Sequence, residues 1–150
     1  VGEGPFPTEE VGEKGDMIRE KGGEYGATTG RPRRCGWFDV ELLKHTARIN
    51  GLTSIALTKM DVLSGQEKIK VAVGYTVEGK NLDYFPSSLQ HKVTPRYQEL
   101  EGWKEDISEC KSYDDLPSAA KEYIAFIEKA VGVPVSIVSV GPDRMNTFVK

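Results

Sequence analysis

The segment Thr58-Lys59-Met60-Asp61 has side chains suited to recognising a nucleobase. An ionised aspartate offers two coplanar acceptor oxygens, and the Watson–Crick edge of guanine offers two coplanar donors, the ring N–H and the amino group. Adenine has an acceptor in place of that ring donor, so it would leave one carboxylate oxygen unpaired. Lys59 can lay its methylene stem over the base while its ammonium stays near oxygen. Lys59 and Asp61 therefore predict a guanine site.

Taken alone, such a segment is more often a Lys/Asp surface turn after a buried strand, here Ile55-Ala56-Leu57. Two other segments of the chain change that balance, because their chemistry fits a nucleotide-binding protein as well.

The second segment, residues 24–36, has neither strand alternation nor helical periodicity. Its two threonine hydroxyls and the backbone N–H groups near Gly30 can hold a carboxylate. Arg31 and Arg33 add planar forks that match carboxylate or phosphate oxygens, and Pro32 stiffens the turn between them. The alternative interpretation is a solvated basic loop that makes surface ion pairs. The small Thr-Thr-Gly sequence beside the arginines favours anion binding.

The third segment is Ser139-Val140-Gly141-Pro142, which follows an apolar run over residues 135–140. Its hydroxyl and backbone N–H groups can hold the carbonyl oxygen or ring edge of guanine. An ordinary Gly-Pro turn is the alternative, and it is favoured when the segment is considered alone. Asp143 and Arg144 are expected to form a local ion pair that shapes the turn.

The composition limits the class of protein. The 150 residues are 38% hydrophobic and 29% charged, which predicts a soluble globular protein with its own core. The net charge of −3 argues against a nucleic-acid partner, and no apolar run approaches the length of a membrane helix. Cys35 and Cys110 lack metal-site spacing and predict reduced thiols in a cytoplasmic protein. Because Val1 opens a loop-like stretch, we expect the chain to be a piece of a longer protein.

The hydrophobic pattern predicts an α/β fold. Helices are expected over residues 16–21, 40–50 (with Asp39 as cap) and 117–131. Strands are expected over residues 54–58, 69–76, 82–85, 135–140 and 146–149, with a turn at Gly79-Lys80. Residues 87–115 carry no clear strand or helix signal, and the two tryptophans, Trp37 and Trp103, are expected to pack in the core. Ligands of open α/β sheets sit outside the carboxyl ends of strands, so the segments 58–62 and 139–144 are expected to face one crevice.

Taken in order, the motifs of this chain resemble the C-terminal part of the adenylosuccinate synthetase family. The matching strings are Val1-Gly2, Gly4-Pro5-Phe6-Pro7-Thr8-Glu9, Glu24-Tyr25-Gly26-Ala27-Thr28-Thr29-Gly30-Arg31, Arg33-Arg34, Gly36-Trp37, Leu57-Thr58-Lys59-Met60-Asp61-Val62, Gly132-Val133-Pro134 and Gly141-Pro142-Asp143-Arg144. They cover nearly the whole chain, and several separated motifs fitting one family are more specific than any of them alone.

The resemblance implies a ligase of purine and AMP biosynthesis that joins IMP to L-aspartate, with GTP as co-substrate, Mg²⁺ as cofactor and a 6-phosphoryl-IMP intermediate. It implies a P-loop-NTPase-like α/β fold with a large mixed central sheet and flanking helices. Residues 1–150 would be the C-terminal portion of this single larger domain. The resemblance also implies a homodimer in the cytoplasm, without nucleic-acid or membrane partners.

The resemblance also assigns roles to residues. The aspartate-binding residues would be Ala27, Thr28, Thr29, Gly30, Arg31, Pro32 and Arg33, with Arg31 also touching IMP and Arg33 also touching GTP. The other GTP-binding residues would be Lys59, Met60, Asp61, Ser139, Val140 and Gly141. Val140 stands where a small polar residue is expected, a change that backbone contacts would survive. The phosphate loop, the catalytic residues and the Mg²⁺ ligands are expected in an N-terminal part that precedes these motifs, so no catalytic or metal-binding residue is predicted here.

Two other functions fit parts of the sequence. A GTPase-like switch module would use Lys59 and Asp61, but it gives the Thr-Thr-Gly-Arg segment no role. A non-catalytic scaffold with incidental turns would leave all the ordered motif matches unexplained.

Overall fold

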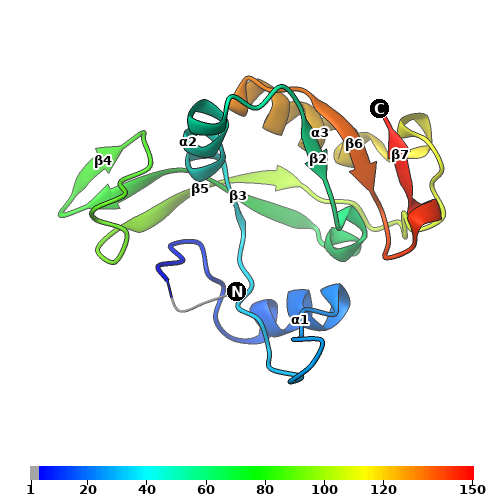
Figure 1. Cartoon of the computed structure of the whole chain (residues 1–150), viewed down its shortest axis with the longest axis horizontal. Coiled ribbons are helices and arrows are strands. Elements are labelled where there is room, and N and C mark those ends of the chain that lie inside the picture. The colour runs from blue at the N-terminus through cyan, green and yellow to red at the C-terminus, as the bar shows by residue number, and fades with distance from the viewer. Residues whose placement is uncertain (1–3) are drawn as a thin grey trace. The chain divides into compact units, whose positions relative to one another are not determined.

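The computed structural model describes residues 4–150, so Val1 and Gly2 lie outside the described residues. The helices and strands of the described residues form a mixed α/β structure, as predicted (Figure 1). The helices are α1 (Glu13–Gly22), α2 (Val40–Asn50) and α3 (Ser118–Val131). The strands are β1 (Phe38–Asp39), β2 (Ile55–Leu57), β3 (Lys68–Val77), β4 (Lys80–Leu82), β5 (Thr94–Glu101), β6 (Val135–Ser139) and β7 (Thr147–Val149). Across the described residues, every helix is too short or too polar to span a bilayer.

The chain folds as two compact units. The first comprises Val1–Glu41 and Lys70–Gln98, and the second comprises Leu42–Ile69 and Glu99–Lys150. The loop of residues 24–36 belongs to the first unit, whereas the segments 58–62 and 139–144 both belong to the second.

Strand β3 is the centre of a sheet that also contains β1, β4 and β5. β1 pairs with β3 in parallel, and β4 pairs with it as an antiparallel hairpin. The predicted turn at Gly79-Lys80 is wrong by one residue, because Lys80 pairs with Val77. The loop is therefore Glu78-Gly79, with φ of 48° and 78°, the two left-handed residues that a tight hairpin requires. β4 ends at Leu82, where the sequence predicted a strand to begin.

Two aromatic residues organise the core of the first unit. Tyr75 is fully buried, and its hydroxyl donates to the Asp39 carboxylate at 2.6 Å. Burial, together with this carboxylate, raises the pKa of Tyr75 far above its ordinary value. Asp39 ends β1 and directly precedes α2, the position expected for its cap, and its carboxylate accepts this buried hydroxyl. Trp37 is 4% exposed and its indole N–H donates to Glu10, so its predicted packing role is confirmed.

The second unit contains a three-stranded sheet in the order β2-β6-β7, drawn as neighbouring arrows in Figure 1. β2 and β6 are parallel, with Leu57 opposite Val138, while β7 runs antiparallel to β6. α3 follows Pro117 and ends at Gly132, whose φ of 77° and N–H bond to the Glu128 carbonyl close the helix. The apolar stripe of α3 is buried at Ala120, Tyr123, Ile124 and Ile127, while Val131 at its end is half-buried.

Strand β5 and the start of α1 are the main differences from the sequence prediction. β5 has a strand's pairing with β3, but most of its side chains are exposed or half-buried and it contains Pro95. A strand of this kind lacks the alternation that sequence reasoning detects, and proline is tolerated near the start of a strand. α1 begins at Glu13, three residues before the predicted Asp16.

The carboxylate of Glu128 joins α3 to β6 and to Lys150. It accepts the Val135 N–H at 2.8 Å and the Lys150 ammonium at 2.7 and 2.6 Å. Burial alone would raise the pKa of the Glu128 carboxyl, but these donors outweigh burial and hold the pKa below its ordinary value of 4.5.

Replacing Glu128 with glutamine is expected to lower the free energy of unfolding by about 1 kcal/mol at neutral pH. A carboxyl whose pKa is lowered by folding stabilises the fold above its unfolded pKa, and this stabilisation is lost as the pH falls through the folded value. The difference between the two proteins should therefore shrink below pH 4.5. Urea unfolding at neutral pH and at about pH 3 measures it. Glu122→Gln, at an exposed position of α3, is the matched control. A difference that is the same at both pH values would contradict the assignment.

Candidate functional site

Two of the three predicted segments leave the same edge of one sheet. Because β2 and β6 are parallel neighbours, their carboxyl ends lie together, and the helical turn Met60–Leu63 after β2 contacts β6. Thr58-Lys59 leaves the end of β2, and Val140-Gly141 leaves the end of β6. The two segments therefore share one edge of this sheet, and their facing one crevice stays a prediction.

Two buried apolar side chains anchor the turn that carries Asp61. Met60 is 1% exposed and Val62 is 7% exposed, and they flank the half-buried Asp61. Lys59 takes a left-handed backbone conformation, with φ of 61°, where the chain turns from β2 into the helical turn. The buried pair on either side of Asp61 fixes the direction in which its carboxylate leaves the backbone.

One oxygen of Asp61 is a buried acceptor without a donor. Its Oδ1 is inaccessible to solvent and accepts no hydrogen bond from any residue in the range 4–150. A buried polar atom without a partner costs free energy, and such atoms are rare in folded proteins. This oxygen is therefore suited to a donor that arrives with a ligand, such as the N–H edge of a nucleobase.

The Ser139–Gly141 loop is held by its own hydrogen bonds. The Ser139 hydroxyl donates to the Gly141 carbonyl at 3.0 Å, and the Val140 N–H donates to the Asn146 carbonyl at 2.8 Å. The Val140 N–H, which the sequence offered to a base, is thus used within the fold. A Cβ on Gly141 would lie 2.8 Å from Cγ of Asn146, so this position requires glycine.

The ion pair predicted between Asp143 and Arg144 is wrong. Arg144 forms no ion pair with residues 4–150, whereas Asp143 caps the short helical turn Arg144–Asn146. The Asp143 N–H donates to Asn146 Oδ1 at 3.2 Å, and the Asn146 N–H donates to the Asp143 carbonyl at 2.9 Å. A local capping box satisfies more backbone groups than a solvent-exposed ion pair would.

The loop of residues 24–36, which belongs to the first unit, contains a turn that is exposed to solvent. The Gly26 N–H donates to the Arg31 carbonyl at 2.9 Å, and the Gly30 N–H donates to the Gly26 carbonyl at 2.8 Å. Gly30 has φ of 64°, a conformation that favours glycine. Residues 27–32 are all exposed. The Gly30 N–H is thus used in closing the turn, and the threonine hydroxyls lie at its exposed end.

The three arginines of this loop have different partners. The guanidinium of Arg31 is exposed and makes no hydrogen bond or ion pair with residues 4–150. Nη1 of Arg33 lies 2.9 Å from Oε2 of Glu24. Arg34 binds Glu9, and its guanidinium lies 5.4 Å from the centre of the Phe6 ring. Arg34 therefore has a structural role, and Arg31 is available to a ligand.

The described residues do not build a metal centre. Among residues 4–150, no three His, Cys, Asp or Glu side chains gather closely enough to hold a metal ion.

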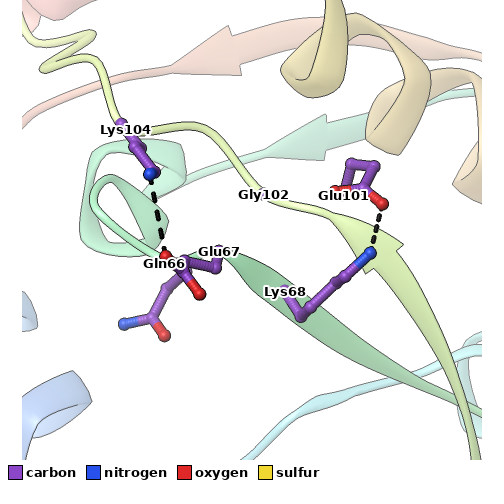
Figure 2. A pocket seen from close by; sticks show the side chains of 6 residues that line it. All are labelled: Gln66, Glu67, Lys68, Glu101, Gly102 and Lys104. Carbon is purple, nitrogen blue, oxygen red and sulfur yellow. Dashed lines mark hydrogen bonds and ion pairs between the residues drawn. The ribbon is translucent and has the colours of Figure 1, made fainter.

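A shallow polar depression of about 300 Å³ lies elsewhere on the second unit (Figure 2). Lys68 pairs with Glu101 and Lys104 pairs with Glu67 across its walls, as Figure 2 shows. The pocket contains none of the predicted site residues. The ion pairs already satisfy its charges, so it offers no single sign of charge to a ligand.

Sequence reasoning missed a segment that contacts the ends of both second-unit loops. Trp103 is buried, its indole N–H donates to Ser64 Oγ at 3.1 Å, and its carbonyl accepts the Gly65 N–H at 2.8 Å. The Ser108 carbonyl accepts the Asn146 amide at 2.9 Å. A lone tryptophan in a polar stretch was the available signal, because a buried indole N–H usually has a partner.

The comparisons with known proteins agree with the motifs. The family model described as adenylosuccinate synthetase matches residues 1–148. Adenylosuccinate synthetases of Clostridioides difficile and Caldanaerobacter subterraneus are 55% and 54% identical over 100% and 99% of this chain. A solved structure of fully ligated adenylosuccinate synthetase from Plasmodium falciparum matches with a TM-score of 0.94 and 46% identity, over 100% of this chain and 37% of that one. The chain spans about a third (35%) of the length of the curated relatives it matches. It belongs to the adenylosuccinate synthetase family.

Proposed function

We propose that the full-length protein joins IMP to L-aspartate to form adenylosuccinate, with GTP hydrolysis, in the synthesis of AMP. In this proposal, the present chain supplies the guanine-binding and aspartate-binding parts of the site. Family membership supports the reaction class, and the chain covers about a third of its relatives' length, so the activity is proposed for the longer protein.

The single observation that carries the guanine assignment is the buried, unpaired Oδ1 of Asp61. Guanine would bring two coplanar donors to this carboxylate, and adenine would bring only one beside a repelling acceptor. Lys59 and Met60 precede Asp61 and would border the base, while Ser139, Val140 and Gly141 enter from the neighbouring strand end. Because the Val140 N–H is already used, the Ser139 hydroxyl oxygen and the Gly141 N–H are the proposed polar contacts of that loop.

The exposed turn Ala27–Arg33 is proposed to bind the aspartate substrate. Thr28, Thr29 and the unpaired guanidinium of Arg31 would hold its carboxylates, and Arg31 would also reach IMP. Arg33 uses Nη1 for Glu24, and its other donors would contact GTP.

The remaining parts of the reaction belong to the rest of the protein in this proposal. Phosphoryl transfer needs a cradle for the phosphates and a bound cation, which stabilise the developing charge. The phosphate loop, the catalytic residues and the Mg²⁺ ligands are proposed to lie outside this chain, on a P-loop-NTPase-like sheet. The full-length protein is proposed to work as a cytoplasmic homodimer, and this chain alone is expected to be inactive.

Adenylosuccinate formation by the full-length protein tests the reaction. We expect product only when IMP, aspartate and GTP are all present, with one phosphate released for each product formed. Phosphate release from GTP that continues without aspartate would instead favour the GTPase-like switch, in which Lys59 and Asp61 bind guanine for signalling. Efficient product formation with ATP in place of GTP would contradict the guanine assignment.

A further inference from the structure

We propose that Asn146 is a positioning residue for guanine recognition, and that it acts with the segment Gly102–Ser108 to fix the spacing of the two guanine-binding loops. The proposal rests on the proposed function, because it concerns the same site. Neither Asn146 nor this segment is among the residues expected to touch the nucleotide. The contacts that Asn146 and this segment make with the two loops lie entirely within the second unit.

Asn146 holds the Ser139–Gly141 loop through its backbone carbonyl and the Asp143 turn that follows through its side-chain oxygen. Its carbonyl accepts the Val140 N–H at 2.8 Å, and its Oδ1 accepts the Asp143 N–H at 3.2 Å. Its side chain fills the space beside Gly141, where a Cβ would lie only 2.8 Å from Cγ. These contacts set the path of the chain from the end of β6 to the start of β7.

The side-chain amide of Asn146 extends this arrangement to a distant segment. Nδ2 donates to the Ser108 carbonyl at 2.9 Å, across 38 residues of sequence. The Ser108 carbonyl is itself oriented by Asp106, whose carboxylate accepts the Ser108 N–H at 2.9 Å. Hydrogen bonding from Ser108, first from its backbone N–H, holds the pKa of the Asp106 carboxyl below its ordinary value.

The other end of the same segment holds the loop that carries Asp61. Trp103 donates to Ser64 Oγ at 3.1 Å and accepts the Gly65 N–H at 2.8 Å, directly after the turn that contains Asp61. Trp103 and Ile107 are each 1% exposed, so the segment is anchored in the core between its two contacts. Gly102 permits the close approach, because a Cβ there would lie 2.0 Å from the Gln66 carbonyl oxygen.

The consequence is a fixed separation between two loops that must contact one base from different strands. Bidentate recognition by a carboxylate depends on geometry, and a displacement of about 1 Å is enough to lose an aligned hydrogen bond. Loosening the Ser139–Gly141 loop should therefore let the base shift against Asp61. Affinity for guanine should fall, and so should the preference for guanine over hypoxanthine, which lacks the amino group.

The test measures the dissociation constants of GDP and IDP by calorimetry on the full-length protein. Asn146→Ala should weaken GDP binding about three- to tenfold, the effect of one or two lost hydrogen bonds. IDP binding should weaken less, so the GDP/IDP preference should fall. The matched control is Asn50→Ala, which removes an exposed amide that donates to the Thr46 carbonyl at 2.9 Å on α2. This control should leave both constants unchanged.

Substitutions of Asp106 provide a second test. Asp106 is exposed, so replacing it should not prevent folding. Asp106→Ala should reproduce part of the loss in GDP affinity and preference. Asp106→Asn should restore both, because the asparagine oxygen can still accept the Ser108 N–H.

The outcomes separate this inference from the proposed function. A wild-type protein that prefers GDP over IDP, with the same preference in Asn146→Ala and Asp106→Ala, would overturn the positioning role and leave the guanine site intact. A loss of folded protein without a change in preference for the folded fraction would also overturn it. A wild-type protein that binds GDP as expected but forms no adenylosuccinate would refute the ligase reaction while the positioning role stands.

Discussion

Replacing Asp61 with asparagine in the full-length protein is expected to abolish efficient use of GTP and to create use of xanthosine triphosphate. The asparagine amide N–H₂ donates where one carboxylate oxygen accepted, so it repels the amino group of guanine and pairs with the carbonyl that xanthine has at that position, while the amide oxygen still accepts the ring N–H. Sites built on hydrogen bonds discriminate by up to roughly 10⁴-fold, because the wrong partner leaves buried groups unpaired. Oδ1 of Asp61 is buried, so a mismatch between the side chain and the base at this position leaves a buried group unpaired. We expect this mismatch to account for most of the lost GTP use.

The measurement is kcat/KM of adenylosuccinate formation with GTP and with xanthosine triphosphate, for wild type and Asp61→Asn. Asp114→Asn is a suitable control, since Asp114 is exposed and its side chain has no partner within residues 4–150. This control should keep the preference for GTP. If Asp61→Asn also kept it, Asp61 would not be the base-recognising residue.

Replacing Arg31 with leucine is expected to raise the KM for aspartate by roughly 10- to 100-fold, the effect of losing a charge-assisted hydrogen bond to a carboxylate. The KM for IMP should rise as well if Arg31 contacts both substrates. Thermal stability should be unchanged, because the Arg31 guanidinium makes no contact with other residues in the range 4–150 that the substitution would break.

Steady-state kinetics with each substrate varied in turn would measure these effects. Arg48→Leu removes another exposed arginine from the last turn of α2 and controls for the loss of surface charge. It should leave all three KM values near those of wild type. An unchanged KM for aspartate in Arg31→Leu would remove Arg31 from the proposed aspartate site.

Elements with a strong local signal were predicted well from the sequence. α3 has a proline before it, a regular apolar stripe and a closing Gly132, and each of these features acts within the element itself. β2 and β6 are short, but their buried residues fixed their positions, and their parallel pairing brought the predicted loops to one edge. By contrast, β5 is a strand because β3 pairs with it, and pairing between distant segments leaves little trace in local sequence.

The same distinction applies to the candidate site. Asp61, Lys59 and Arg31 could be named as candidates because their side chains carry recognisable chemistry at characteristic spacings. Asn146 was missed and Trp103 was expected only to pack in the core, because their proposed positioning role depends on bonds to Ser108 and Ser64, 38 and 39 residues away. Arg33 and Val140 were judged from type alone, and the structure shows that Glu24 and Asn146 already use some of their donors.

A structure of the full-length protein bound to GDP would test guanine recognition by Asp61 most directly. We predict that both Asp61 carboxylate oxygens lie about 2.7–3.2 Å from the ring nitrogen and the amino nitrogen of guanine, with Ser139–Gly141 along another edge of the base. A guanine bound elsewhere, or one whose Watson–Crick edge faces solvent instead of Asp61, would contradict this account.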